Sequence, residues 1–377
     1  MSGPQVLVAM SGGVDSSVAA ALLAEAGCDV TGVHLKLAKT PAHEQVKGKG
    51  CCTLADADDA RRVAATLGIP FYVWDFAEQF EREVVADFEA EYARGRTPNP
   101  CARCNEQVKV AGLLARARAL GFDALATGHY ARVSDGRLYK GADEAKDQSY
   151  VLYMLGPDQL AHLRLPLGEL TKPEVRATAA RLGLRVAQKP ESFDVCFIPD
   201  GDTAGWLERR LGPQPGEVVD TAGRALGRHQ GAYRYTVGQR RGLGIAVPTP
   251  RYVLRVEPAA ARVVVGERAD LAVGTVELER VTTTDGRPLR PGPARARLRA
   301  HGPEVACQVV PLGLGDRRAR LDLDEPITAV APGQAGVLYD GDLVLGGGTI
   351  AATSAARPAA AEARAAGDAN GRAEAGA

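Results

Sequence analysis

A glycine-rich segment near the start of the chain has the residue types of a phosphate-binding loop. The apolar run Val-Leu-Val-Ala-Met at 6–10 leads into Ser-Gly-Gly-Val-Asp-Ser-Ser at 11–17, and an alanine-rich stretch follows. The apolar run favours a buried parallel strand, the paired glycines let the backbone approach a ligand, and a helix start presents unpaired N–H groups to an anion. No lysine follows the glycines, so this is not the P-loop pattern. The segment predicts a strand, a phosphate-gripping loop and a helix from about Ser16 to Gly27, which together bind ATP.

Two cysteines form a second group that could do chemistry. Cys101 and Cys104 lie in Thr-Pro-Asn-Pro-Cys-Ala-Arg-Cys-Asn at 97–105. The prolines keep the backbone extended, so we expect the helix to begin only at about Asn105, with both thiols at or just before its start. The helix dipole and Arg103 would lower the pKa of a thiol there, which makes Cys104 a candidate nucleophile. Half of a zinc site is the alternative, but no second CxxC or CxxH lies at a suitable spacing.

A third cysteine, Cys196, lies in Glu-Ser-Phe-Asp-Val-Cys-Phe at 191–197. Taken alone, it is typical of a buried packing residue. The chain has seven cysteines, an odd number, and its sequence contains no signal peptide and no run long enough to span a bilayer. We therefore expect a reducing, cytoplasmic environment in which cysteines are available for chemistry.

The elements that must position these residues alternate between strands and helices through the first two hundred residues. Strands are expected at 29–35, 71–74 and 124–127, with helices at 53–67 and 105–120. This alternation predicts a parallel sheet with helices on both faces, in which ligands lie beyond the carboxyl ends of the strands. The glycine-rich loop, Leu35 and Gly128 all fall at such ends, so one nucleotide could contact all three. A hairpin at 131–139 and a helix opened by a capping box at Thr171 and Glu174 follow.

The second half of the chain has a different pattern. A chain of 377 residues with 45% hydrophobic content can form two or three domains. Its formal net charge is zero, so any nucleic-acid-binding surface must come from local clustering of basic residues. Residues 220–257 contain seven arginines and three interleaved tyrosines, which favours an RNA-binding surface. Short alternating segments from about 271 to 350 predict a small antiparallel barrel, and an Ala/Gly/Arg/Glu-rich tail follows.

Together these motifs resemble the tRNA-specific 2-thiouridylase family, PP-loop ATPases that thiolate the wobble uridine of certain tRNAs. The Ser-Gly-Gly-x-Asp-Ser loop, the Thr-Pro-Asn-Pro segment with its cysteine and the distant Cys-Phe-Ile carry the resemblance. Further matches follow in the family's order: Ala-Thr-Gly-His-Tyr at 126–130, Lys-Asp-Gln-Ser-Tyr at 146–150, Tyr-Thr-Val-Gly-Gln-Arg-Arg-Gly-Leu-Gly at 235–244 and Pro-Gly-Gln at 332–334.

The resemblance implies a role for each matching position. Cys104 would be the catalytic nucleophile and Cys196 would receive sulfur as a persulfide. Asn99 to Cys101 would sit at the target base, with Cys101 as a third catalytic candidate. ATP would contact Ala9, Met10, Ser11, Gly12, Gly13, Val14, Asp15, Ser16, Leu35 and Gly128. The tRNA would contact Asn99, Pro100, Cys101, His129, Lys146, Asp147, Gln148, Arg299, Ala300 and Gln334. The chain departs from the common pattern at Cys101, where many members carry Asp, and at Ala300, where Gln is frequent.

The chemistry of thiolation accounts for two thiols. Oxide is a poor leaving group from the uracil C2 carbonyl, whereas transfer of AMP onto that oxygen makes the leaving group a phosphate ester. A persulfide then needs a second thiol to release its sulfur, which leaves a disulfide to be reduced. Mg²⁺ would bridge the phosphates, with Asp15 as a candidate ligand or, alternatively, a charge at the helix N-terminus.

Two alternatives to the persulfide route remain, and the first of them uses the same three cysteines. Cys101, Cys104 and Cys196 could hold three irons of a [4Fe–4S] cluster whose open iron binds sulfide, and the spacing does not decide between this and the persulfide route. A PP-loop ligase that adenylates a small metabolite would need neither the arginine-rich segment nor the paired thiols.

The expected architecture has four parts. They are a PP-loop catalytic domain at 1–203, a central tRNA-binding domain at 204–270, a C-terminal barrel at 271–352 and a disordered tail at 353–377. The expected partners are tRNA and a sulfur donor such as a cysteine desulfurase or a relay protein. We expect a monomer that does not bind membranes.

Overall fold

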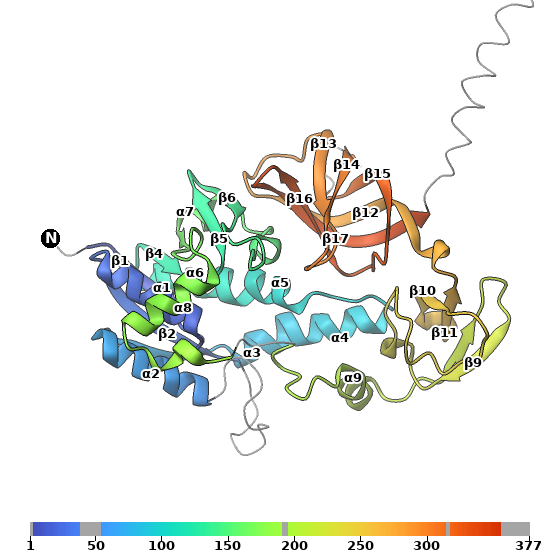
Figure 1. The fold of residues 1–377 in the computed structure, drawn as a ribbon, viewed down its shortest axis with the longest axis horizontal. Helices are drawn as coiled ribbons and strands as arrows, with labels where there is room; N and C mark the ends of the chain where they lie inside the picture. Colours follow the sequence, from blue (N-terminus) through green and yellow to red (C-terminus); the bar gives the residue numbers. More distant parts are fainter. Residues whose placement is uncertain (1–2, 38–53, 191–194, 314–316, 356–377) are drawn as a thin grey trace, which may run out of the picture.

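The computed structural model describes residues 3–37, 54–190, 195–313 and 317–355. Its strands form a parallel sheet, a small mixed sheet and an antiparallel barrel, which follow one another along the chain. Figure 1 shows the parallel sheet at one end of an elongated molecule and the small sheet at the other, with the barrel beside the helices that join them. The predicted fold class, an α/β catalytic domain followed by two β-rich modules, is confirmed.

Five strands form the parallel sheet, with β1 at its centre. Val6, Leu7 and Val8 of β1 are at most 2% exposed. A strand that is buried on both faces reads as a continuous apolar run, so the prediction of a buried parallel strand is confirmed. In spatial order the strands are β3 (Phe71–Asp75), β2 (Asp29–Lys36), β1 (Gln5–Ala9), β4 (Ala124–Ala126) and β7 (Leu163–Arg164).

Helices cover both faces of this sheet. The α-helices are α1 (Val14–Glu25), α2 (Leu54–Leu67), α3 (Ala77–Phe80), α4 (Ala86–Ala93), α5 (Pro100–Cys104), α6 (Ala111–Ala119), α7 (Pro157–Ala161) and α8 (Lys172–Arg181). The π-helical turns are η1 (Glu81–Val85) and η2 (Asn105–Val110), and the 3-10 turns are η3 (Ser149–Val151) and η4 (Arg185–Gln188). Helices α1, α2 and α8 share a core with Val6 and Val8, whereas α6 packs on the opposite face with Leu7. Side chains alternate between the faces of a strand, so β1 anchors both cores.

The helix that carries the paired cysteines begins earlier than the sequence predicts. Its first residue is Pro100 rather than Asn105, and the Asn99 side chain caps it. Proline is tolerated at the first helical position because its missing N–H would have no partner there in any case. The expectation that the prolines delay the helix is therefore wrong, and Cys101 and Cys104 lie inside its first turns.

Two local predictions in the catalytic domain are confirmed. The backbone N–H of Thr171 donates a 2.7 Å hydrogen bond to the Glu174 carboxylate, which opens α8 as a capping box. Strands β5 (Ala131–Ser134) and β6 (Arg137–Lys140) form the expected hairpin. This hairpin also reaches the barrel, since Tyr139 pairs with Leu343 of its last strand.

The small mixed sheet forms the core of the central module. Its strands, in spatial order, are β10 (Tyr252–Glu257), β11 (Arg262–Gly266), β8 (Gly216–Val219) and β9 (Ala225–His229). Helix α9 (Thr203–Leu211) precedes the sheet, and short 3-10 turns lie at η5 (Ala232–Arg234), η6 (Pro258–Ala260) and η7 (Ala269–Leu271). The module is β-rich, as predicted.

Six antiparallel strands close into the C-terminal barrel, which the sequence predicts correctly. In order around the barrel they are β12 (Ala272–Thr283), β15 (Ala319–Thr328), β14 (Glu304–Pro311), β13 (Gly292–Arg297), β16 (Ala335–Asp340) and β17 (Leu343–Ala355), and β17 pairs with β12. The expectation of a tail from residue 353 is wrong at its start, because Thr353 pairs with Val276 and Ala355 with Val273. The remainder of the predicted tail, 356–377, lies outside the described residues.

Within the described ranges, no helix has the length and apolar character that a bilayer crossing requires.

Candidate active site

The glycine-rich loop is ordered by its own serines. Helix α1 begins at Val14 with Gly13 as its N-cap, two residues before the predicted start at Ser16. The Ser16 hydroxyl accepts a 3.1 Å hydrogen bond from the backbone N–H of Ser11, and the Ser17 hydroxyl donates to the Gly13 carbonyl at 2.8 Å. The serines therefore shape the loop, and neither side chain caps the helix, although serine is a frequent N-cap residue.

Two glycines allow the backbone segments around this loop to touch. Gly12 has a φ of +80°, and a Cβ there would lie 2.2 Å from the carbonyl oxygen of Asp56. A Cβ on Gly128 would lie 2.6 Å from the backbone nitrogen of Ser16. Only glycine fits either position, so the end of β4 packs directly onto the first turn of α1.

The strand ends beside the loop also lie where the sequence predicts. Strand β1 lies between β2, which carries Leu35, and β4, which leads to Gly128. The buried His34 ring donates from Nδ1 to the Met10 carbonyl at 2.9 Å, which ties β2 to the end of β1. Met10 and Val14 are core side chains, so they could contact a nucleotide only through their backbone.

The Asp15 side chain has partners from two distant segments. Lys172 Nζ lies 2.8 and 2.9 Å from its two carboxylate oxygens, and the Tyr130 hydroxyl donates to Oδ1 at 2.8 Å. Lys172 is only 8% exposed, so the ion pair is well buried on one side. With both oxygens engaged, Asp15 does not fit the predicted role of a metal ligand.

The cysteine segment is held between the catalytic domain and the barrel. Asn99 Oδ1 accepts hydrogen bonds from the backbone N–H groups of Cys101 and Ala102 at 3.1 and 3.2 Å. On the barrel side, Gln334 Nε2 donates to the Thr97 carbonyl at 2.7 Å, and the Thr97 N–H donates to the Pro332 carbonyl. The Gln334 side chain thus positions the loop before the cysteines instead of pointing into solvent.

Cys104 and Cys196 contact one hydrophobic cluster. Cys104 is buried within it, and Cys196, which is half-buried, packs against it from the segment that follows 191–194. The neighbouring Phe197 ring anchors this segment, with its centroid 5.8 Å from that of Phe80 and 5.2 Å from that of Phe88. Two thiols that are far apart in the sequence therefore contact the same hydrophobic cluster.

Cys101 is placed differently, because it is exposed. Among the residues that the structure describes, which include all three candidate cysteines, no three His, Cys, Asp or Glu side chains are grouped closely enough to hold a metal ion. The predicted alternative of a [4Fe–4S] site on Cys101, Cys104 and Cys196 therefore does not fit this arrangement.

His129 is half-buried and directly follows Gly128, which packs on the first turn of α1. Its Nδ1 is 2.7 Å from the Thr127 hydroxyl. Burial, with a smaller contribution from the Lys109 ammonium, lowers the pKa of His129 to about 3. The ring is therefore neutral at physiological pH and can contact RNA as a hydrogen-bonding group but not as a cation.

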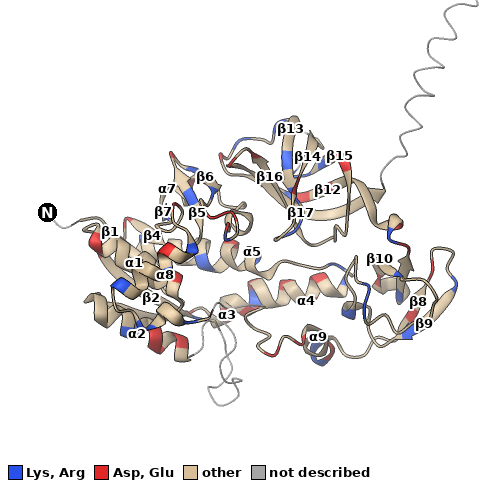
Figure 2. Ribbon diagram, in the orientation of Figure 1, with Lys and Arg blue, Asp and Glu red and all other residues tan. Residues whose placement is uncertain are grey.

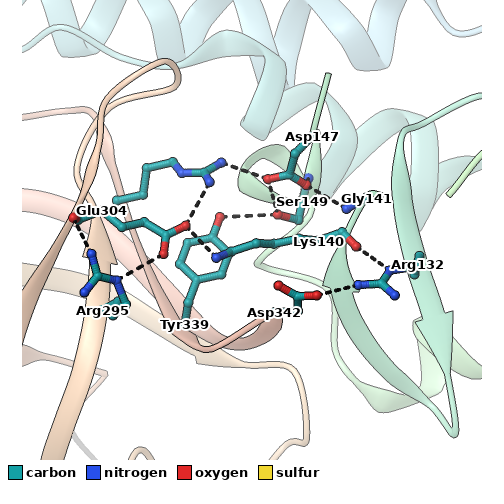
Figure 3. Close-up of polar contacts among 10 residues, drawn as sticks. Arg132, Lys140, Gly141, Asp147, Ser149, Arg295, Glu304, Tyr339 and Asp342 are labelled. Atoms are coloured by element: carbon teal, nitrogen blue, oxygen red, sulfur yellow. Dashed lines mark hydrogen bonds and ion pairs between the residues drawn. The ribbon is translucent and has the colours of Figure 1, made fainter. Parts of the chain in front are cut away.

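The polar loop at 141–148 is the meeting point of the catalytic domain and the barrel (Figure 3). The Asp147 side chain, 2% exposed, accepts hydrogen bonds from the N–H groups of Gly141 and Ser149, the Ser149 hydroxyl and the Arg297 guanidinium. Its carboxylate is therefore engaged within the chain and is not available to an RNA in this conformation. Gln148, which is exposed, accepts a 3.0 Å hydrogen bond from the N–H of Tyr130.

Figure 3 shows that this contact belongs to a larger charge network. Glu304 of the barrel pairs with Arg297 at 2.9 Å, Lys140 at 2.7 Å and Arg295 at 3.5 Å, so it joins three cations to the contact with Asp147. The Tyr339 ring lies under two of these cations, at 4.7 Å from Lys140 Nζ and 5.1 Å from Arg297 Cζ. Sequence reasoning identified only Asp147 in this network, because Glu304 and Lys140 belong to no recognised motif.

Arg299 and Ala300 lie in the exposed turn after β13. Lys146 is half-buried in the loop at 141–148, and Pro100 forms the first turn of α5. Contact of these residues with tRNA remains a prediction.

The arginine-rich segment at 220–257 is less basic and less aromatic at its surface than the sequence predicts. Tyr233 and Tyr235 are 3% and 7% exposed and belong to the packing of the central module. Four of the seven arginines form ion pairs, and Figure 2 shows both signs of charge in this region. These pairs are Arg224 with Asp220, Arg234 with Glu208, Arg251 with Glu267 and Arg255 with Glu257. Arg228, Arg240 and Arg241 are exposed and form no ion pair with any described residue.

Comparison with known proteins gives consistent matches along the chain. Three family models match in succession: a tRNA methyl transferase HUP domain at residues 4–200, a tRNA methyl transferase PRC-barrel domain at 204–267 and an aminomethyltransferase beta-barrel domain at 276–350. Among solved structures, the chain resembles NMN synthetase from Francisella tularensis with a TM-score of 0.33 and 20% identity, covering 56% of this chain and 77% of that one. It also resembles a 4-thiouridine synthetase in complex with RNA and ATP, with a TM-score of 0.35 and 15% identity, covering 55% of this chain and 50% of that one.

Curated relatives are far more similar. The tRNA-specific 2-thiouridylase MnmA of Thermobifida fusca is 55% identical over 95% of this chain and 98% of its own length. The MnmA proteins of Salinispora tropica and Streptomyces coelicolor are 54% and 53% identical, over 93% and 95% of this chain and 100% and 97% of their own lengths. With such identity along almost the whole of both partners, the chain belongs to the tRNA-specific 2-thiouridylase family.

Proposed function

We propose that this chain is an ATP-dependent tRNA sulfurtransferase that replaces the C2 oxygen of the wobble uridine by sulfur. The observation that best supports the proposal is the shared hydrophobic cluster of Cys104 and Cys196, in a chain that also has a glycine-lined loop at the strand ends. A small-metabolite ligase would need the loop but not two thiols in contact with one cluster.

In the first step, the C2 oxygen of uridine attacks the α-phosphate of ATP, and pyrophosphate leaves. The backbone N–H groups at the start of α1 would bind the departing phosphates, with Gly12 and Gly128 permitting the close approach. The neutral His129 ring and the Asn99 to Cys101 segment would flank the base. The N–H groups at the start of α1 would stabilise the negative charge that develops on the departing pyrophosphate.

In the second step, the terminal sulfur of a Cys196 persulfide adds to C2. The Cys104 thiolate then attacks Cys196 Sγ, which breaks the persulfide S–S bond and forms a Cys104–Cys196 disulfide. Collapse of the adduct forms the C2=S bond and expels AMP. A two-electron thiol reductant restores both cysteines, and a cysteine desulfurase or relay protein supplies the next sulfur.

Contacts to the tRNA would come from several parts of the chain. We assign them to Arg299 and Ala300 of the barrel, Lys146 and Gln148 of the polar loop, and the unpaired Arg228, Arg240 and Arg241 of the central module. Asp147 and Gln334 would act indirectly, because their side chains hold the loops that carry the contacts.

The test is thiolation by the purified chain. An unmodified tRNA transcript is incubated with ATP, a cysteine desulfurase with its cysteine substrate as the persulfide source, and a thiol reductant, and 2-thiouridine is measured by mass spectrometry of the nucleosides. We expect product that depends on ATP and on Cys104, with one pyrophosphate released per sulfur incorporated. Pyrophosphate release that a small acceptor stimulates and tRNA does not would instead favour the ligase.

A further inference from the structure

A lysine from a distant segment lies on the glycine-rich loop. Lys189 follows η4, and its Nζ is 2.9 Å from the carbonyl oxygen of Gly12. The same ammonium is 2.7 Å from Asp56 Oδ1 and 2.7 Å from Asp59 Oδ2, both in α2. An ammonium has three N–H donors, so these three contacts use all of them.

The backbone that presents this lysine is held firmly. Arg176 of α8 donates to the carbonyl of Ala187 at 2.7 Å and reaches the carbonyl of Lys189 itself at 3.4 Å. The N–H of Lys189 donates to the Val186 carbonyl at 2.9 Å, and Val186 is buried in the core beneath α1. These hydrogen bonds fix the backbone of Lys189, so its ammonium is held against the glycine-rich loop.

Negative charge gathers around the contact between Lys189 and Gly12, and a cation there offsets it. Asp56 and Asp59 place two carboxylates beside Gly12, whose own backbone touches the first turn of α2. A triphosphate that binds the loop brings further negative charge to the same place. Partial burial opposes the charged form of Lys189, but the hydrogen bonds to Asp56 and Asp59 outweigh it and raise its pKa, so the ammonium stays charged at neutral pH.

We propose that Lys189 is a second cation of the glycine-rich loop, beside the Lys172 that pairs with Asp15. It is a positioning residue that bonds Asp56 and Asp59, offsets their charge and fixes Gly12 so that phosphates can bind. The inference rests on the proposed use of ATP. It gives the loop, which has no lysine of its own in the sequence, a positive charge from a residue 177 positions away. Since all three donors are engaged, Lys189 acts through the loop and through charge balance.

The test measures binding of pyrophosphate and of ATP to the full chain by isothermal titration calorimetry, without tRNA. In Lys189→Met, Asp56 and Asp59 lose the ammonium that bonds both of them, so we expect both dissociation constants to rise about tenfold or more. Lys189→Arg keeps the charge and should stay close to the wild type. The triple variant Lys189→Met, Asp56→Asn, Asp59→Asn removes the repulsion and should recover most of the lost affinity.

A matched control is Arg181→Met, which breaks an exposed ion pair with Glu25 on α1 and should leave the affinity unchanged. Equal affinity of the wild type and Lys189→Met would overturn the inference. Failure of the triple variant to recover, with a thermal midpoint like that of the wild type, would also overturn it, because charge balance would then not be the cause. Failure of the wild type itself to bind ATP would refute the proposed function instead.

Discussion

The Arg297 guanidinium, in strand β13 of the barrel, lies 2.8 Å from the carboxylate of Asp147 in the catalytic domain. The loop that holds Asp147 also reaches the glycine-rich loop by two routes. Gln148 binds the backbone of Tyr130, and Asp143 accepts a 2.9 Å hydrogen bond from the N–H of Lys172. Tyr130 and Lys172 both bond Asp15, so contiguous polar contacts join the barrel to the glycine-rich loop.

The first prediction concerns this ion pair. Arg297→Met leaves Asp147, whose side chain is 2% exposed, without its cation, and we expect the free energy of unfolding to fall by about 3 kcal/mol. Urea denaturation measures the change. The double variant Arg297→Met, Asp147→Asn should lose less than the sum of its single variants, and strict additivity would show that the two side chains do not interact.

The second prediction concerns pH. The pKa of His129 is about 3 in the folded chain, against an ordinary value of about 6.5 once unfolded. Between these values the unfolded chain binds one more proton at this site, so the free energy of unfolding decreases as pH falls from about 6.5 toward 3. Denaturation curves of the wild type and His129→Gln between pH 7 and 4 should differ in slope, with the variant less sensitive to acid. Parallel slopes would show that His129 is solvated.

The third prediction separates the cysteines. We expect Cys104→Ala and Cys196→Ala each to lower the thiolation rate by a factor on the order of 10⁴, since each thiol takes part in bond formation. Cys101→Ala should keep activity within about tenfold of the wild type, because the exposed Cys101 has no step in the proposed chemistry. Nucleoside mass spectrometry measures all three. Loss of activity in all three variants, together with iron in the purified protein, would support the cluster route.

The fourth prediction concerns the contact between β4 and α1. Gly128→Ala places a methyl group 2.6 Å from the backbone nitrogen of Ser16, and we expect this overpacking to cost about 1–3 kcal/mol and to weaken ATP binding. Gly156→Ala is the control, because its added Cβ meets no atom within 4 Å and its φ is negative. Similar ATP affinities in the two variants would mean that this contact does not shape the nucleotide site.

The features that the sequence predicts well are those encoded in neighbouring residues. The run Val6–Val8 has the composition of a doubly buried strand, and the alternating segments after 271 have the period of a barrel. Tyr233 and Tyr235 were misassigned to a surface because aromatic residues among arginines suit either an RNA contact or a core, and local pattern does not distinguish them. Partners of Asp15 and Asp147 could not be predicted, because a single sequence carries no sign of which distant lysine or arginine will meet them.

The β5–β6 hairpin gives the molecule a further property. Its chain belongs to the catalytic domain, but Tyr139 pairs with Leu343 and the N–H of Lys140 donates to the carbonyl of Asp342, so it extends the sheet that the barrel begins. The two modules are thus interlocked, and a transplant of the barrel alone between relatives would break a seam formed by both. Recombination that respects this architecture must carry the hairpin and the barrel together.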